Sequence, residues 1–196
     1  MIGIIDYGMG NLRSVQKAFE YIGEKAIISG KFKELNDCDK LILPGVGSFG
    51  KGISELKSRE LFDYVIFRKD VQTKILGICL GMQFLLSKSY EDGENTGLDI
   101  IKGDVIKFKK GKIPQIGWNE VYNLKTPLFD GIKEGSKFYF VHSYYAETTE
   151  KFTMATCDYN LEYAAAIYSE NVYGVQFHPE KSGSTGLKLL KNFAKL

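Results

Sequence analysis

Short apolar runs alternate with amphipathic segments through the first half of the chain. Strands are predicted at residues 1–6, 26–28, 40–43 and 74–78. Apolar residues at helical spacing predict helices between them: one that Asn11 can cap, then segments at about 50–57, 59–69 and 80–88. Near-continuous apolar strands separated by helices indicate a parallel sheet that is covered on both faces.

The second half of the chain is dominated by β-type segments. These lie at 104–108, 137–146, 153–157, 162–168 and 172–177, with a hairpin turn predicted at 169–171 and a final helix at about 184–195. The whole pattern predicts one α/β domain over residues 1–196. We expect a three-layer, flavodoxin-like α/β/α arrangement around a central mixed, largely parallel sheet.

Composition and charge exclude several classes of function. Lys and Arg number 26 against 24 Asp and Glu, and the basic stretch at 107–112 is interpreted as a solvated hairpin or loop, so no nucleic-acid partner is expected. No signal peptide is expected, and no apolar run approaches the roughly 18 residues of a membrane helix. The three cysteines, Cys38, Cys79 and Cys157, lie far apart, which favours a reducing, cytoplasmic compartment and offers no structural zinc site.

Cys79 is the first candidate for chemistry. It follows the predicted strand 74–78 directly and precedes a predicted helix, with Gly77 and Gly81 two positions to either side. This is the G-x-S-x-G pattern of a nucleophile elbow with cysteine in place of serine. The positive end of the helix would favour the nucleophilic thiolate. The alternative is a buried structural cysteine beside packing glycines.

His178 and Glu180 are the candidate partners of that thiol. Pro179 favours extended geometry at the residue before it, and in an extended segment residues 178 and 180 project to the same side. Glu180 could then orient the imidazole as the carboxylate of a Ser-His-Asp triad does. The alternative is a strand-end histidine bonded to a neighbour. His142 has no carboxylate at this spacing and is interpreted as structural or substrate-lining.

Acyl transfer also requires donors for an oxyanion. The N–H of Leu80 is one candidate, and the loop at 44–50 (PGVGSFG) could supply a second from Val46 or Gly47. A phosphate cradle is the alternative for this loop, but it contains no G-x-G-x-x-G and no G-K-[ST] ending. Gln83, one helical turn after Cys79, can reach the same pocket.

Together these residues resemble the class I glutamine amidotransferases, which combine such a loop, a G-x-C-x-G elbow and a late H-P-E. The resemblance covers essentially the whole chain and includes the segments 6–11 (DYGMGN), 114–119 (PQIGWN) and 140–144 (FVHSY). Gln115 departs from the histidine expected there in many relatives. By position, the resemblance implies that glutamine is contacted by Gly45, Gly47, Gln83, Glu91, Ser143 and Tyr144. Glu94 lies close to Glu91 in the sequence and is the alternative to it. The resemblance also implies that a partner interface contains Asn11, Trp118, Tyr139 and Lys181. Core packing is the alternative for Trp118, and a plain surface charge for Lys181.

The resemblance further implies a reaction completed on another chain. Cys79 would release ammonia from glutamine without metal or organic cofactor, and a (β/α)8-barrel synthase subunit in a heterodimer would use it to form imidazole glycerol phosphate and an aminoimidazole carboxamide ribonucleotide. We also expect weak activity until that partner docks and the glycine-rich 45–47 backbone presents its N–H. Three alternatives stay open: a paralogue serving amidino groups on surface glycans, a free-standing cysteine hydrolase, and a non-catalytic interaction subunit.

Overall fold

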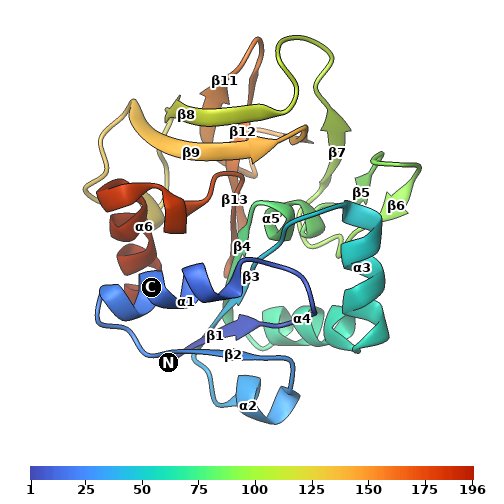
Figure 1. Cartoon of the computed structure of the whole chain (residues 1–196), viewed down its shortest axis with the longest axis vertical. Helices are drawn as coiled ribbons and strands as arrows, with labels where there is room; N and C mark the ends of the chain where they lie inside the picture. The colour runs from blue at the N-terminus through green and yellow to red at the C-terminus, as the bar shows by residue number, and fades with distance from the viewer.

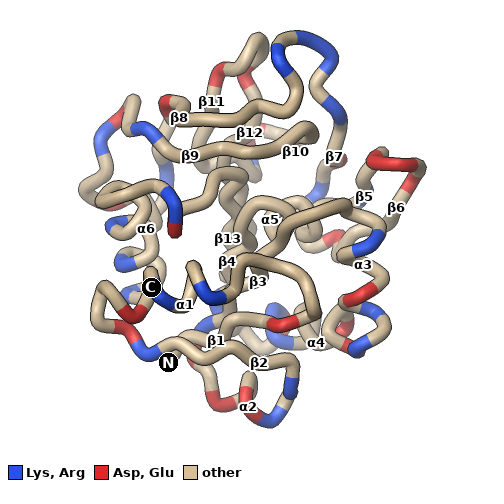
Figure 2. Tube along the Cα trace, in the orientation of Figure 1, with Lys and Arg blue, Asp and Glu red and all other residues tan.

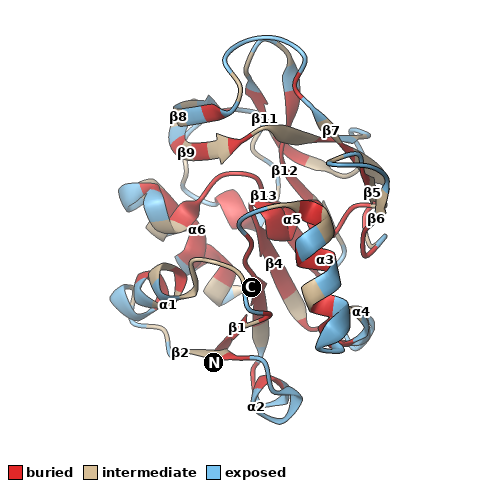
Figure 3. Ribbon diagram, turned by 45° about the vertical axis from the view of Figure 1, so that its right-hand side comes forward, coloured by how far each residue is buried: buried red, intermediate tan, exposed pale blue.

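A mixed sheet of eleven strands forms the centre of the protein, as seen in a computed structural model of residues 1–196 (Figure 1). Its core is five parallel strands in the order β2-β1-β3-β4-β13. They are β1 (Ile2–Ile5), β2 (Ala26–Ser29), β3 (Lys40–Leu43), β4 (Lys74–Ile78) and β13 (Val172–Val175). Figure 3 shows β1 and β4 largely buried, as apolar runs covered on both faces must be, and the outer strand β2 only partly buried.

Beyond β13 the sheet continues with mostly antiparallel pairing through β12, β10 and β7. The remaining strands are β5 (Lys88–Ser89), β6 (Asn95–Thr96), β7 (Gly103–Lys107), β10 (Tyr144–Thr148), β11 (Thr153–Asp158) and β12 (Glu162–Ser169). A separate two-stranded sheet pairs β8 (Gln115–Val121) with β9 (Ser136–His142). The predicted turn at 169–171 is confirmed, because Ser169 pairs with Val172 across it.

Helices cover the two faces of the sheet and define two apolar cores. The first core takes side chains from α1 (Leu12–Tyr21) and α6 (Gly183–Lys195). The second takes them from α2 (Phe32–Asn36), α3 (Phe49–Ser58), α4 (Leu61–Asp70) and α5 (Leu80–Phe84). Two 3₁₀ turns, η1 (Pro127–Phe129) and η2 (Pro179–Lys181), complete the chain. The expected three-layer α/β/α arrangement is confirmed.

Several predicted boundaries were wrong. The helix expected over 80–88 ends at Phe84, and the N–H groups of Ile100 and Ile101 both bond to the carbonyl of Leu85. The β segment expected over 137–146 is two strands, β9 and β10, in different sheets. Strand β8 and helix α2 were not predicted. Asn11 precedes α1, but its side chain makes no capping bond and instead accepts from the Ser14 hydroxyl at 2.9 Å.

Charged residues of both signs are interspersed over the loops and helix surfaces (Figure 2). The basic stretch at 107–112 runs from the last residue of β7 into the loop before β8, where Lys109, Lys110 and Lys112 carry the charge. None of the helices has the length and apolar character needed to cross a membrane. The parallel strands β3, β4 and β13 end at one edge of the sheet, and the candidate chemistry lies there.

Candidate active site

Cys79 occupies a sharp turn between β4 and α5. Its backbone has φ 55° and ψ −111°, a conformation that non-glycine residues seldom adopt. The Cys79 N–H donates to the Val175 carbonyl at 2.8 Å, and the Cys79 carbonyl accepts from the Gln83 N–H at 3.2 Å. These bonds to β13 and α5 hold the turn, as the nucleophile-elbow pattern predicts.

The two glycines that flank Cys79 are required by close backbone contacts. A Cβ on Gly77 would lie 2.6 Å from the Gly81 carbonyl oxygen, and a Cβ on Gly81 would lie 1.8 Å from the Leu43 carbonyl oxygen. Neither backbone atom can move aside without breaking the strand or helix that contains it. The glycines therefore allow β3, β4 and α5 to meet immediately beneath the thiol.

His178 lies just beyond β13 and contacts both Cys79 and Glu180. Its Nδ1 lies 2.8 Å from Oε1 of Glu180, and the Cys79 side chain lies near enough to act on the charge of the ring. The expected contact is present, and His178 is extended as predicted, with φ −99° and ψ 96°. The prediction that the extended segment continues to residue 180 is wrong, because Pro179–Lys181 form the 3₁₀ turn η2. Pro179 fixes the start of that turn, and the turn brings Glu180 back against the imidazole.

The environment of His178 favours its protonated form. Burial acts to lower the pKa of His178, but hydrogen bonds and charge from Cys79 and Glu180 outweigh it and raise that pKa to about 10. The second histidine, His142, responds in the opposite direction: burial lowers its pKa to about 4. His178 is therefore cationic at neutral pH, and His142 is neutral.

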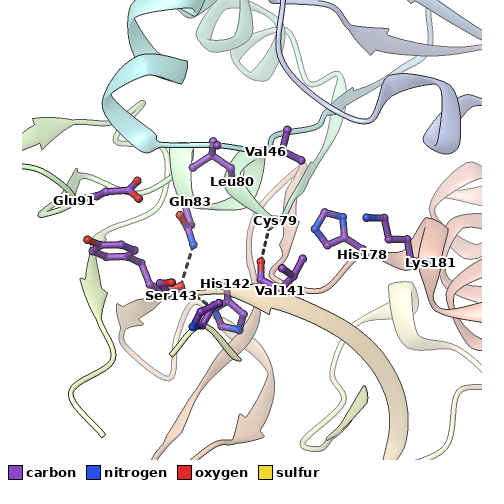
Figure 4. Close-up of a pocket in the computed structure, with 13 residues that line it drawn as sticks. Val46, Cys79, Leu80, Gln83, Glu91, Val141, His142, Ser143, His178 and Lys181 are labelled. Atoms are coloured by element: carbon purple, nitrogen blue, oxygen red, sulfur yellow. Dashed lines mark hydrogen bonds between the residues drawn. The ribbon is translucent and has the colours of Figure 1, made fainter. Parts of the chain in front are cut away.

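Cys79 and His178 open onto a cavity of about 340 Å³ (Figure 4). Glu91 and Lys181 lie at its two opposite ends. Eleven of the residues singled out from the sequence line it: Val46, Gly47, Cys79, Leu80, Gln83, Glu91, His142, Ser143, Tyr144, His178 and Lys181. The other two lining residues, Pro114 and Val141, were not anticipated.

The cavity residues distinguish Glu91 from Glu94. Glu91 lines the cavity and accepts the N–H of Phe49, the first residue of α3, at 2.6 Å. Glu94 instead forms an exposed ion pair with Lys88 at 2.9 Å. Gly45 does not line the cavity: it is buried, and a Cβ there would lie 2.7 Å from the backbone nitrogen of Gly81. We therefore interpret Gly45 as a close-packing position beneath the loop.

Three backbone N–H groups near Cys79 are the candidate donors to an oxyanion. Those of Val46 and Gly47 have no acceptor within the protein, and the third belongs to Leu80. Leu80 is the first residue of α5, so its N–H has no partner in its own helix. Gly47 has φ +96°, which a residue with a side chain would adopt only under strain. All three lie at the cavity and are available to an oxygen atom bound there.

The four residues expected at a partner interface lie on neighbouring elements. The rings of Trp118 and Tyr139 are 6.1 Å apart across β8 and β9, and Lys181 Nζ is 5.9 Å from the centre of the Tyr139 ring. Asn11 directly precedes α1, which packs against the turn that holds Lys181. Trp118 is 53% exposed, so its interpretation as a core residue is wrong.

A cysteine on a strand–helix elbow beside a carboxylate-bound histidine defines a thiol-dependent acyl-transfer site. The chain belongs to the class-I glutamine amidotransferase family, whose family model matches residues 3–196.

Full-length relatives carry a more specific name. A protein of Caldanaerobacter subterraneus named imidazole glycerol phosphate synthase subunit HisH is 50% identical over 199 residues, covering 100% of this chain and 98% of its own length. A protein of Methanocaldococcus jannaschii with the same name is 50% identical over 198 residues and covers both chains completely.

Solved structures of more distant sequence share the fold. One described as a glutamine amidotransferase superposes with a TM-score of 0.79 at 18% identity, covering 99% of this chain and 97% of the other. A structure of PurLQS from Thermotoga maritima gives a TM-score of 0.78 at 20% identity, with the same coverage.

Proposed function

We propose that this chain is the glutaminase subunit of an imidazole glycerol phosphate synthase and supplies ammonia for histidine biosynthesis. The observation that carries the proposal is 50% identity, over the full length of both chains, to proteins named as that subunit. The cavity at Cys79 supports it, because it combines a thiol, a cationic histidine and free N–H donors. The three free cysteines agree with a reducing, cytoplasmic location.

Glutamine fits the Glu91 end of this cavity by charge. The Glu91 carboxylate can take the α-ammonium group at the end remote from Lys181. Ser143 and Tyr144 line the wall between the ends, where β9 gives way to β10. Bound in this direction, glutamine places its side-chain amide towards Cys79 and His178.

The proposed reaction begins with attack of the Cys79 sulfur on the amide carbon of glutamine. The carbonyl oxygen becomes an oxyanion that accepts N–H bonds from Leu80 and from Val46 or Gly47. His178 gives its proton to the departing nitrogen, and ammonia leaves a thioester on Cys79. His178 then removes a proton from the water that hydrolyses the thioester, and glutamate is released. Glu180 holds the imidazole in the orientation that both steps need.

The acceptor of the ammonia is proposed to lie on a (β/α)8-barrel synthase subunit bound in a heterodimer. The matched family model spans residues 3–196, and the full-length relatives are named as subunits. The surface formed by Asn11, Trp118, Tyr139 and Lys181 lies beside the cavity, since Lys181 lines both. Docking there would close the cavity, carry ammonia across without loss to water and order the 45–47 backbone.

Labelled glutamine tests this proposal directly. With the cognate synthase and its nucleotide ligand, glutamine carrying ¹⁵N in its amide should yield imidazole glycerol phosphate with ¹⁵N in the ring. Glutaminase turnover should rise when the synthase is added. Cys79→Ala should abolish glutamine-dependent synthesis and leave synthesis from free ammonia intact. Unlabelled product, or turnover that does not respond to the synthase, would contradict the proposed partner.

A further inference from the structure

A chain of hydrogen bonds separate from the His178–Glu180 pair reaches the Cys79 sulfur, and its last two bonds are buried. It begins at the backbone carbonyl of Tyr144, which accepts from Gln83 Nε2 at 3.0 Å and from His142 Nδ1 at 2.8 Å. A carbonyl oxygen carries no hydrogen, so both partners must present N–H groups. The Gln83 amide is therefore oriented with its nitrogen towards Tyr144.

The orientation of Gln83 fixes that of Gln176. Gln83 Nε2 also donates to Oε1 of Gln176 at 2.9 Å, so the second polar atom of Gln176 is its amide nitrogen. That nitrogen lies 3.7 Å from the Cys79 sulfur, within the reach of an N–H···S bond. Reversing the Gln176 amide would set two N–H groups against each other at Gln83. The group that faces the sulfur is therefore a donor.

Strand register explains why Gln176 is adjacent to the thiol. Strands β4 and β13 run parallel with Val175 opposite Ile78, so the next residues along, Gln176 and Cys79, lie side by side. The flanking residues Val175 and Phe177 enter the first apolar core, and Gln176 points the other way. Gln176 has no exposed surface, and an amide there would be costly unless its hydrogen-bonding groups were used.

We propose that Gln176 is a further catalytic residue, which donates an amide N–H to the Cys79 sulfur and stabilises its thiolate form. The thiolate occurs twice in each turnover, before attack on the amide and again when the thioester is hydrolysed. A fixed donor in a buried site stabilises that charge without reorganising. Gln83 is then the positioning residue that holds Gln176, and the Tyr144 carbonyl is its anchor. The inference rests on Cys79 as the nucleophile and is independent of the synthase.

Alkylation of Cys79 tests the proposal without glutamine or a partner. The whole chain is treated with iodoacetamide across a pH series, and the modified Cys79 peptide is quantified by mass spectrometry. Gln176→Met keeps the length of the side chain and removes the donor. It should move the alkylation midpoint upward by about one pH unit and lower glutaminase kcat/KM about tenfold. Gln176→Leu serves the same purpose if the first variant does not fold.

Two comparison variants separate donation from packing. Gln83→Met removes the amide that holds Gln176 but leaves the Gln176 N–H, so its shift should be smaller. Gln16→Met removes a part-buried amide in α1, which donates to the Ala26 carbonyl at 3.0 Å, and should leave the midpoint unchanged. An unchanged midpoint in the folded Gln176 variant would overturn the proposal. Equal shifts in the Gln176 and Gln83 variants would overturn it too, since packing alone would then explain them.

Discussion

At the scale of single residues, two histidines of this chain are held in opposite protonation states. His178 has its pKa raised to about 10, because Cys79 and Glu180 outweigh burial. Burial dominates at His142, lowers its pKa to about 4 and leaves its Nδ1–H bonded to the Tyr144 carbonyl. His178 is therefore a charged imidazole at one wall of the cavity, whereas His142 is a neutral imidazole that acts as a structural donor at another.

His142 should make the protein sensitive to acid. Its folded pKa of about 4 lies below the value of about 6.5 expected in the unfolded chain. The unfolded chain therefore binds the proton first, and stability falls as the pH drops through this window. Between pH 7 and pH 5 the loss from His142 should be about 2 kcal/mol. In urea unfolding at both pH values, His142→Asn should lose about that much less than the parent protein.

Glu180 should control both activity and alkaline stability. A folded pKa of about 10 lies above the unfolded value, so the contribution of His178 is complete below about pH 6.5 and is lost as pH rises through 10. Glu180→Gln should therefore lose less stability than the parent between pH 7 and pH 10.

The kcat of the Glu180→Gln variant should fall by roughly 10²-fold or more, because the histidine would no longer be held in the orientation that proton transfer requires. Unchanged kcat would argue against an orienting role for Glu180.

The sequence predicted the residues with distinctive spacing and missed those defined by distant partners. Cys79 was found from its flanking glycines, and His178 with Glu180 from their order around a proline. Gln176 lies in the same segment, but its significance depends on a carbonyl at Tyr144 and an amide at Gln83. Contacts between residues this far apart in the sequence follow from the fold, and local pattern does not reveal them.

At the scale of elements, the parallel strands were well predicted because each is a continuous apolar run, and α1, α3, α4 and α6 because each has one apolar face at helical spacing. Strand β8 was missed because polar residues face inward on it: Gln115 is buried and bonded to Tyr163 and Asn119, whereas Trp118 faces out. Helix α5 was expected to extend through Leu85 and Leu86. Gly97 passes so close to the Leu86 carbonyl that a Cβ would lie 2.1 Å away, so tertiary contacts replace the next helical turn.

The close contact between the end of β3 and α5 should not tolerate a methyl group at position 81. Gly81→Ala would place its Cβ 1.8 Å from the Leu43 carbonyl oxygen, and we expect a loss of about 3 kcal/mol in the free energy of unfolding. Gly183→Ala is the matched control, because Gly183 has φ +57° with no atom within 4 Å. It should cost only the backbone strain of roughly 1–2 kcal/mol. Denaturant unfolding of both variants measures the difference.

At the scale of the whole molecule, the fold gathers the chemistry at one edge and leaves the hairpin β8–β9 beside it. Cys79 and His178 follow the adjacent parallel strands β4 and β13, so the topology alone makes them neighbours. Trp118, Tyr139 and Lys181 extend from that edge along the hairpin and η2. The proposed docking surface is thus continuous with the cavity.

Trp118 should contribute strongly to binding of the proposed synthase. Trp118→Ala is expected to weaken the complex at least about tenfold, since exposed aromatic residues frequently dominate interfaces. Phe67→Ala is the control, because Phe67 on α4 has the same 53% exposure as Trp118. Calorimetric titration of each variant with the synthase measures the affinities. Equal affinity for both variants would place the interface elsewhere.

The hairpin also bears on how the protein behaves when it is produced alone. Ile116 and Trp118 are 60% and 53% exposed, and they alternate along β8, so both project to the same side of the strand. Such an apolar stripe on a two-stranded sheet invites self-association at high concentration. Co-expression with the synthase should therefore raise the soluble yield of this chain, and the gain should shrink when Ile116 and Trp118 are made polar.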